Sequence, residues 1–573
     1  FDLEGGIDFD GQVASMPALL AAAKRGSNTV TLGDGSVGIL PEDWLARWSL
    51  LEVSTDVKGD RVRFKQSQGW LLDALLAERG DVDVDAGFRK WRERLDSFRG
   101  VDARDELKGL HGELRPYQRE GLGWFQFLRD LGFGGCLADD MGLGKTVQVL
   151  ALLQERAKEK DASKPTLVVA PKSLTFNWRA EAERFTPKLS VLDYSGVDRT
   201  KLARKVAQSD LVVTTYGTLR QDAAFFKDVE FDYVILDEAQ AIKNPQSQVA
   251  KAARLLRADH RLVLTGTPVE NHLGELWSLF EFLNPGMLGR SSAFRTLFTG
   301  RADLTLDDDR RKTLARALKP FFLRRTKEQV LRDLPEKSEQ VIWCDLDDQE
   351  RVEYDALAAH FRATLLAGGG EIEGAQKLHV LEALLRLRQA ACHPGLLDAA
   401  RKTEEGAKLE VLQPLLEEIV ESEHKALVFS QFTSFLSILR PRLDAAGWEY
   451  AYLDGSTRDR QAQVERFQND PKCKLFLISL KAGGFGLNLT AADYVFLLDP
   501  WWNPASETQA IDRAHRIGQT RNVMAYRLIA RGTVEERVLE LQSKKKHLAE
   551  AILSEDNAVL RDLTREDLER LLT

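Results

Sequence analysis

A short loop at residues 138–146, Ala-Asp-Asp-Met-Gly-Leu-Gly-Lys-Thr, constrains the fold of this chain more than any other stretch. An apolar run ending at Ala138 precedes the loop, and Val147, Leu150 and Ala151 follow it at the spacing of one helix face. The loop therefore lies where a buried strand passes into the first turn of a helix. Loops in this position bind phosphate groups.

Gly142, Gly144, Lys145 and Thr146 supply the chemistry for such binding. Glycines let backbone N–H groups curl around anionic oxygens, a lysine reaches the outer phosphates, and a threonine hydroxyl can ligate magnesium. The strict pattern G-x-x-x-x-G-K-[ST] fails at its first position, where Asp139 stands. The alternative is a glycine-rich turn before a surface helix, but the motifs downstream favour a nucleotide site.

From about residue 114 the sequence alternates short apolar runs with helical stretches, which is typical of parallel-sheet α/β layers. The runs lie at residues 167–170, 211–214, 233–236 and 262–265 and, after a mostly helical stretch, at 426–429, 475–478 and 494–498. The sequence therefore predicts two α/β lobes. Residues 332–337 are predicted to form a hinge between them, and the three glycines at 368–370 a flexible loop.

Residues 1 to about 100 are predicted to form a separate unit whose function the sequence does not indicate. The expected elements are a hairpin at residues 29–40, a helix opened by Pro41 that carries Trp44 and Trp48 on one side, and helices around residues 69–78 and 87–98. We interpret the tryptophans as core residues, with a ligand platform as the alternative. Since Phe1 reads as the middle of a strand, we expect the chain to be a fragment, so the absence of a targeting signal carries little weight.

Composition excludes several classes of protein. A length of 573 residues suggests three or four domains, and no apolar stretch is long enough to span a membrane. The net charge of -8 gives no global signal for nucleic acid, although a local cationic groove remains compatible with it. The four cysteines, Cys136, Cys344, Cys392 and Cys473, form no C-x-x-C pair, which argues against zinc and disulfides and favours a reducing cytoplasm.

Asp237 and Glu238 follow the apolar run at residues 233–236, so we expect both carboxylates at the carboxyl end of a buried strand. There Asp237 can hold magnesium, and Glu238 can orient and deprotonate an attacking water. A helix-capping acid pair is the alternative. The next apolar run ends in Thr-Gly-Thr-Pro at residues 265–268. Alone this motif is weak evidence of function, but after the two earlier motifs it fits an element that couples the nucleotide site to a partner site.

Arg513 and Arg516 stand three residues apart, which predicts that both lie on one helix face. Two such guanidiniums from one lobe could stabilise charge on a phosphate bound by the other lobe. A solvated basic helix face is the alternative.

Seven motifs stand in a fixed order along the chain. They are Leu-Arg-Pro-Tyr-Gln at 114–118, the loop at 139–146, Asp-Glu-Ala-Gln at 237–240, Leu-Thr-Gly-Thr-Pro at 264–268, Leu-Arg-Gln-Ala-Ala-Cys-His-Pro at 387–394, residues 479–490, and Asp-Arg-Ala-His-Arg-Ile-Gly-Gln at 512–519. Together they resemble the SWI/SNF-type ATPases of helicase superfamily 2 over about residues 105–573. Asp139 is the usual residue of that family, whereas Asp140 replaces its common Glu and Gln240 the His usual in eukaryotic members. These departures leave ATPase activity expected and its coupling efficiency open.

The resemblance implies an ATP site completed by Mg²⁺. Lys145, Asp237, Glu238, Arg513 and Arg516 would be catalytic, and Thr146 and Asp237 would hold the metal. Gln118 would read the adenine edge, with Arg115 helping to form its pocket. The implied ATP-binding set is Arg115, Gln118, Asp140, Met141, Gly142, Leu143, Gly144, Lys145, Thr146, Gln240, Gly486, Arg513 and Arg516.

The same resemblance implies a grip on the phosphates of duplex DNA between the lobes. The candidates are Lys172, Trp178, Thr215, Tyr216 and Gly217 in the first lobe and Gln431, Gly455, Ser456, Lys481, Gly483, Gly484 and Trp502 in the second. Hydroxyls, backbone N–H groups and isolated cations suit contact to the backbone, whereas base reading needs Arg, Asn and Gln concentrated on one face. Trp178 and Trp502 could equally be packing residues.

The implied fold is α/β, with two RecA-like parallel-sheet lobes, helical insertions and a small α+β accessory domain before them. The expected domains are residues 1–104 (accessory), 105–335 (first lobe), 336–404 (helical insertion of the second lobe), 405–532 (second lobe) and 533–573 (brace helices that expose Lys544, Lys545 and Lys546). A solvated charge run is the alternative for these lysines.

The implied function is an ATP-dependent double-stranded DNA translocase that remodels or displaces DNA-bound protein complexes without unwinding the duplex. An RNA-directed or RNA-polymerase-directed remodeller is the alternative within the enzymes, and a DNA-binding scaffold switched by ATP is the alternative outside them. Expected partners are duplex DNA and DNA-bound proteins or RNA polymerase, with no membrane. We expect a monomeric, bacterial, cytoplasmic protein associated with the nucleoid, and we find no zinc or chromatin-reader module in the sequence.

Overall fold

A computed structural model describes most of the chain. The described residues are 2–24, 27–40, 56–59, 61–64, 69–76, 84, 86–96, 109–158, 164–172, 174–196, 199–266, 273–288, 318–331, 334–366, 375–422, 424–480, 487–502 and 504–540. They belong to two compact units, one comprising residues 1–140 and 144–326 and the other residues 141–143 and 327–573.

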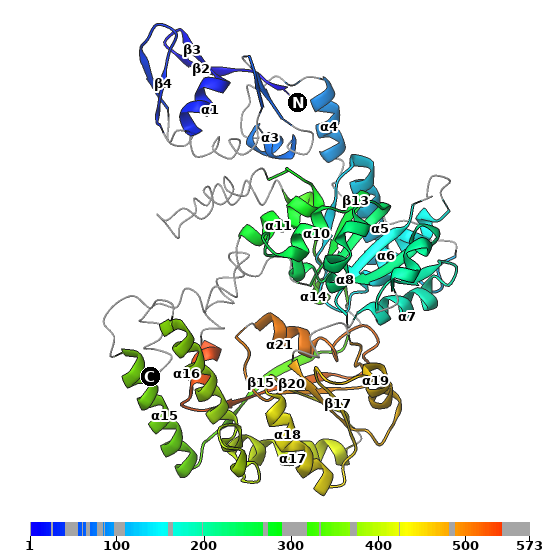
Figure 1. Ribbon diagram of the computed structural model, residues 1–573, viewed down its shortest axis with the longest axis vertical. Coiled ribbons are helices and arrows are strands. Elements are labelled where there is room, and N and C mark those ends of the chain that lie inside the picture. The colour runs from blue at the N-terminus through cyan, green and yellow to red at the C-terminus, as the bar shows by residue number, and fades with distance from the viewer. Residues whose placement is uncertain are drawn as a thin grey trace. The chain divides into compact units, whose positions relative to one another are not determined.

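The first unit is built on a seven-stranded parallel sheet in the order β10-β11-β9-β12-β13-β8-β14 (Figure 1). Its strands are β8 (Gly135–Leu137), β9 (Thr166–Ala170), β10 (Val191–Asp193), β11 (Leu211–Thr215), β12 (Glu230–Asp237), β13 (Arg257–Leu264) and β14 (Phe322–Leu323). The four apolar runs predicted for this lobe are β9, β11, β12 and β13, so the prediction of a parallel-sheet lobe is confirmed. The two edge strands, β10 and β14, were not predicted.

Helices cover both faces of this sheet because its central strands are apolar on both sides. Residues of α5 (Pro116–Leu131), α6 (Lys145–Arg156) and α7 (Thr175–Phe185) share one core with Val168 and Ile235. Residues of α8 (Tyr216–Gln221), α9 (Ala223–Phe226) and α10 (Gln248–Arg254) share the other with Leu167 and Val234. The other described helices of this unit after α5 are η3 (Arg199–Gln208), η4 (Ala239–Ile242), α11 (Leu273–Leu283) and η5 (Lys319–Phe321).

The second unit is built on a six-stranded parallel sheet in the order β15-β20-β19-β16-β18-β17 (Figure 1). Its strands are β15 (Lys337–Cys344), β16 (Ala426–Ser430), β17 (Tyr450–Leu453), β18 (Leu475–Ser479), β19 (Tyr494–Leu497) and β20 (Val523–Ala530). The three apolar runs predicted for this lobe are β16, β18 and β19. The second parallel-sheet lobe is therefore confirmed as well.

The helices of the second unit pack in the same manner. Residues of α17 (Ala407–Glu421) and α18 (Thr433–Ala445) lie in the core on one face, and residues of α19 (Arg460–Asn469) and α21 (Pro504–Ile511) in the core on the other. The unit begins with α14 (Lys327–Val330), and its helical insertion contains α15 (Asp348–Leu366), α16 (Ala375–Cys392), η6 (Pro394–Leu396) and η7 (Ala399–Arg401).

The N-terminal region carries small antiparallel pieces. Its elements are β1 (Asp2–Leu3), β2 (Gly6–Phe9), β3 (Gln12–Ser15), α1 (Met16–Lys24), β4 (Thr29–Thr31), β5 (Val37–Ile39), β6 (Asp56–Lys58), β7 (Arg61–Arg63), α3 (Gly69–Leu76) and α4 (Ala86–Asp96). β4 and β5 pair antiparallel as the predicted hairpin, and α3 and α4 are the two predicted helices.

Three expectations lie wholly outside the described residues. They are the helix opened by Pro41, the glycine loop at 368–370 and the exposed lysines at 544–546. Within the described part of the chain, no helix is long and apolar enough to cross a membrane.

Candidate active site

The predicted phosphate loop follows β8 and passes directly into α6. Gly144 is the N-cap of α6, and no side chain of the described residues caps this helix end. Gly142 and Gly144 have φ values of 90° and 73°, a left-handed conformation that favours glycine. A Cβ at Gly144 would also lie 2.6 Å from Nε2 of Gln118, so a larger residue there would displace the end of that side chain. The first-turn N–H groups of α6 are thus arranged as an anion site requires.

A buried ion pair fixes the start of the loop and explains the aspartate at the first motif position. Asp139 is fully buried and accepts hydrogen bonds from Arg325, at 2.9 Å from Nε and 2.5 Å from Nη2. The Gln148 side chain bonds to both partners, at 3.2 Å to Asp139 Oδ2 and 2.9 Å to Arg325 Nη2. The backbone continues the link, because Asp140 N donates to Arg325 O at 3.0 Å. A glycine at position 139 would leave this guanidinium without its buried counterion, since its other carboxylate neighbour, Glu120, lies 4.0 Å away and is exposed.

Lys145 stands at the first position of α6 and points back over the loop. Its ammonium donates to the carbonyl oxygens of Asp139 at 2.6 Å and Asp140 at 3.3 Å. Thr146, the next residue of α6, is half-buried. The structure therefore places both predicted phosphate-binding side chains at the mouth of the loop.

Gln118 and Arg115 lie at the N-terminus of α5, beside the loop. Gln118 Oε1 accepts a hydrogen bond from Arg115 N at 2.9 Å, which closes this end of α5, and its Nε2 faces Gly144. Burial raises the pKa of the neighbouring Tyr117 to about 12, so its hydroxyl stays protonated. The adenine-reading role of Gln118 stays a prediction, now with an anchored side chain.

The acid pair stands at the carboxyl end of β12, as expected. Asp237 is in register with Leu264 of β13, which is in register with Leu137 of β8, so Asp237 and the start of the loop are two strands apart, about 10 Å. Asp237 Oδ2 accepts a hydrogen bond from Trp178 Nε1, and its carbonyl oxygen one from the Tyr216 hydroxyl, both at 2.8 Å. These two aromatic side chains fix both the carboxylate and the backbone of Asp237.

Burial and the neighbouring Glu238 carboxylate raise the pKa of Asp237, while the Trp178 hydrogen bond and the Lys145 charge oppose this shift. Glu238 has a φ of 49°, a strained conformation for a residue with a side chain. Its Oε2 is buried and has no hydrogen-bond partner among the described residues. Two adjacent buried carboxylates of this kind need a cation.

The residues therefore fit a Mg²⁺ ion that arrives with a nucleotide. The described residues contain no group of three or more His, Cys, Asp or Glu that could hold a metal. Magnesium bound with a nucleotide needs only one or two protein ligands, because waters and phosphates complete its shell. Asp237 and Thr146 are the residues that would supply them.

Four further candidates for the nucleotide and DNA sites lie outside the described residues. They are Gly486, Lys481, Gly483 and Gly484. Gln240, by contrast, is half-buried in η4, directly after the acid pair.

The predicted DNA contacts of the first unit divide into exposed and buried residues. Lys172 and Gly217 are exposed, and they follow the carboxyl ends of β9 and β11. Trp178 and Tyr216 are buried, at 1% and 8% exposure, and hold Asp237. Thr215 caps α8 by accepting a hydrogen bond from Thr218 N at 3.0 Å.

In the second unit the candidates follow three strand ends of one parallel sheet. Gln431 follows β16, Gly455 and Ser456 follow β17, and Trp502 follows β19. Because the strands are parallel, these residues share one edge of the sheet. Gly455 and Ser456 are exposed, and Gln431 and Trp502 are half-buried.

The expectation that Arg513 and Arg516 lie on one helix face is wrong. α21 ends at Ile511, and residues 512–518 form turns. Two carbonyl groups that a continuing helix would need are bound elsewhere: Arg513 O accepts from Leu489 N at 3.0 Å, and His515 O accepts from the Lys327 ammonium. Arg513 is buried, and Arg516 is half-buried and donates to Leu487 O at 3.2 Å.

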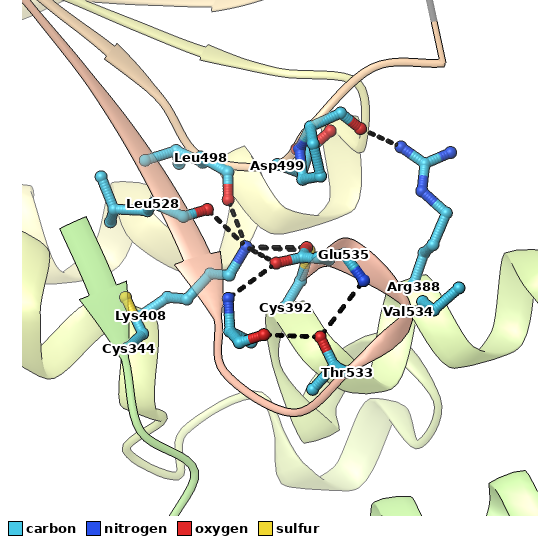
Figure 2. Close-up of polar contacts among 12 residues, drawn as sticks. Cys344, Arg388, Cys392, Lys408, Leu498, Asp499, Leu528, Thr533, Val534 and Glu535 are labelled. Atoms are coloured by element: carbon cyan, nitrogen blue, oxygen red, sulfur yellow. Dashed lines mark hydrogen bonds and ion pairs between the residues drawn. The ribbon is translucent and has the colours of Figure 1, made fainter. Parts of the chain in front are cut away.

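A second buried ion pair lies at the carboxyl end of β19, an interior strand of this sheet (Figure 2). Lys408 and Glu535 are both fully buried, with 2.7 Å between Nζ and the carboxylate. Lys408 Nζ also donates to Leu498 O at 2.6 Å and Leu528 O at 3.1 Å. Although burial alone would lower the pKa of Lys408, the surrounding acidic groups raise it. The pair fixes β19 where it leads into the segment of Trp502.

Sequence reasoning missed Arg325, Gln148, Lys327, Lys408 and Glu535. For Gln148 and Lys408 the available signal is a polar residue between two apolar neighbours, Val147 and Val149 or Ala407 and Leu409, whereas the other three have a polar neighbour and give no such signal. That signal identifies a buried polar residue but not its partner.

Comparison with known proteins agrees with this architecture. A model of the SNF2-related domain matches residues 117–396, and one of the helicase conserved C-terminal domain matches residues 407–518. The chain is 38% identical over 527 residues to the putative ATP-dependent helicase/translocase YwqA of Bacillus subtilis, covering 89% of this chain and 56% of that protein. It is 36% identical over 541 residues to human TATA-binding protein-associated factor 172, covering 81% of this chain and 29% of that protein.

Among solved structures, the Sulfolobus solfataricus SWI2/SNF2 ATPase core in complex with dsDNA is 36% identical, with coverage of 82% of this chain and 98% of that one and a TM-score of 0.41. The chain spans 56% of the Bacillus protein and 29% of the human one, so it corresponds to part of each. From the two matched domains in this order, we conclude that the chain belongs to the SNF2-related ATPases with a helicase C-terminal domain.

Proposed function

We propose that this chain is an ATP-driven motor that moves along double-stranded DNA and displaces or remodels proteins bound there, without separating the strands. The acid pair carries the proposal. The carboxylate of Glu238 lies beside that of Asp237, and its Oε2 has no hydrogen-bond partner among the described residues. Lys145, at the start of α6, is close enough for its charge to act on Asp237. A site that only bound nucleotide would not need such a base.

Each residue then has a defined part in hydrolysis. The loop N–H groups and Lys145 bind the phosphates, and Glu238 orients the attacking water and accepts its proton. Thr146 and Asp237 would hold Mg²⁺, which would supply neutralisation of the phosphate charge. Arg513 and Arg516 stabilise the charge that develops on the transferred phosphoryl group.

The DNA grip is proposed from the chemistry of the strand ends. Lys172 and Gly217 in the first unit, and Gly455 and Ser456 in the second, are exposed and offer cations, hydroxyls and backbone N–H groups. Such groups bind phosphates without reading bases. The names of two relatives agree with this proposal: one is called a helicase/translocase, and the other a factor associated with the TATA-binding protein.

The test is ATP turnover measured in parallel with no polynucleotide, duplex DNA, single-stranded DNA and RNA. Lys145→Ala serves as the blank, and Lys158→Ala, an exposed lysine just after the same helix, is the matched control. We expect duplex DNA to stimulate most strongly, stimulation to fall steeply with salt because the contacts are to phosphate, and no strand separation. Stronger stimulation by RNA would overturn the choice of DNA, and turnover no higher than the blank would overturn hydrolysis itself. Glu238→Gln addresses the scaffold alternative: if this variant binds ATP, does not turn it over and still displaces a DNA-bound protein, the motor is refuted.

A further inference from the structure

Arg325 and Lys327 are two buried basic residues separated only by Thr326. Each is 7% exposed, whereas the flanking Arg324 and Glu328 are exposed. The first compact unit ends at Thr326 and the second begins at Lys327. The two side chains therefore act within different units although they are two positions apart in sequence.

Within the first unit, Arg325 holds the phosphate loop. Its Nε and Nη2 donate to the two oxygens of Asp139, its backbone N donates to Asp139 Oδ1 at 3.1 Å, and its carbonyl oxygen accepts from Asp140 N. Nη1 donates to the carbonyl oxygen of Tyr117, and the guanidinium lies 5.1 Å from the centre of that ring. The loop is thus fixed at its first two residues, Asp139 and Asp140.

Within the second unit, Lys327 holds the segment that contains Arg513. Its ammonium pairs with Asp512 Oδ1 at 2.7 Å and donates to the carbonyl oxygen of His515. Asp512 and His515 stand on either side of Arg513, and both are 8% exposed. One ammonium therefore binds the side chain of the residue before Arg513 and the backbone of the second residue after it, in the turn that replaces the expected helix.

We propose that Arg325 and Lys327 are positioning residues for the proposed ATP hydrolysis: Arg325 sets the phosphate loop, and Lys327 sets the backbone that carries Arg513. This inference rests on the proposed function, and it links the residue that holds the phosphate loop to the residue that holds the Arg513 segment. Because only one residue separates the two anchors, the chain between them has little slack. Arg325, which holds the nucleotide-binding loop, is thereby joined through one residue to Lys327, which holds the segment of Arg513.

The two roles predict different kinetic defects. Arg325→Lys keeps the charge but loses the two-pronged contact to Asp139, so the loop loosens and the dissociation constant for ATP rises about tenfold. Lys327→Met leaves the loop untouched, so ATP binds as in the wild type, whereas kcat falls about tenfold or more because Arg513 acts only in the transition state. Lys327→Arg can still pair with Asp512 and restores part of kcat.

The experiment measures ATP affinity, duplex-stimulated kcat and melting temperature for these variants beside Arg324→Lys and Lys319→Met, which change exposed residues of the same types. Asp512→Asn is added, and the double variant with Lys327→Met should lose no more than either single one, because both remove the same contact. The proposal is supported if the controls match the wild type, if Arg325→Lys weakens ATP binding, and if Lys327→Met lowers kcat without weakening ATP binding.

Wild-type turnover with variants that behave as their controls would overturn the positioning roles alone. The same holds if affinity and kcat fall together in proportion to the melting temperature, since that is the mark of a merely structural role. No turnover in the wild type would overturn the proposed function as well, so the two failures are distinguishable.

Discussion

Replacing Asp139 by glycine would restore the standard phosphate-loop pattern, yet we expect it to destabilise the first unit. Asp139 is fully buried, and the side chain of its partner Arg325 is 9% exposed. The substitution removes every carboxylate contact of this guanidinium at Asp139 and one of the bonds made by Gln148. Removing one partner of a buried ion pair costs about 3–5 kcal/mol, because the remaining charge stays buried without compensation. The greater backbone freedom of glycine adds about 0.5–1 kcal/mol.

The assay is denaturant unfolding of the wild type, Asp139→Gly, Arg325→Met and the double variant. Because the chain has two compact units, the transition must be assigned to the first one, for example by hydrogen exchange of α6. The double variant should be more stable than Asp139→Gly alone, since it no longer buries an unpaired charge. A loss below about 1 kcal/mol for Asp139→Gly would match an exposed ion pair and refute the reasoning. So would a double variant whose loss equals the sum of the single losses.

Two further predictions concern the other buried charges. Lys408→Met should lower the unfolding free energy of the second unit by about 3–5 kcal/mol, and adding Glu535→Gln should recover part of the loss in denaturant melts; a single variant as stable as the wild type would contradict this. The pKa of Asp237 is higher in the folded protein than in the unfolded chain, where it lies near 4. The stability that protonated Asp237 contributes is therefore fully present below about pH 4 and is lost as pH rises through the folded pKa. The loss is about 1.4 kcal/mol for each tenfold difference in proton affinity between the two states. In the absence of Mg²⁺ and nucleotide, the melting temperature should therefore fall more steeply from about pH 5 upward in the wild type than in Asp237→Asn, and parallel profiles would exclude this assignment.

The strands that sequence analysis found are those whose side chains are apolar on both faces. β9 and β16 are buried at every position, so each reads as an uninterrupted apolar run. β15 begins with the polar residues Lys-Ser-Glu-Gln, of which the first two are partly buried and the next two exposed, and β14 has two residues, so neither gives such a run. β20 is interrupted by Arg527, which pairs with Glu507 and Glu339 and is thus polar for a tertiary reason.

The candidate site was predictable where its chemistry is contiguous in sequence. The phosphate loop and the acid pair are short motifs, and each lies at the strand end that its apolar run indicated. The supporting contacts are not contiguous: Arg325 and Asp139 are 186 positions apart, and Trp178 and Asp237 are 59 apart. The helix expected at Arg513 and Arg516 failed for the same reason, because Lys327 and Leu489 bind carbonyl groups that local pattern assigns to the helix.

The left-handed backbone at Glu238 has one further consequence. Consecutive side chains of an extended strand point to opposite faces, so two neighbouring acids would normally be separated by the sheet itself. β12 stops at Asp237, and the turn at Glu238 breaks the alternation, which allows both carboxyl groups to share one interior. Repulsion and conformational strain are thereby concentrated in a single dipeptide. A bound cation relieves the first, whereas the second is a permanent property of the polypeptide, with a typical cost of about 1–3 kcal/mol.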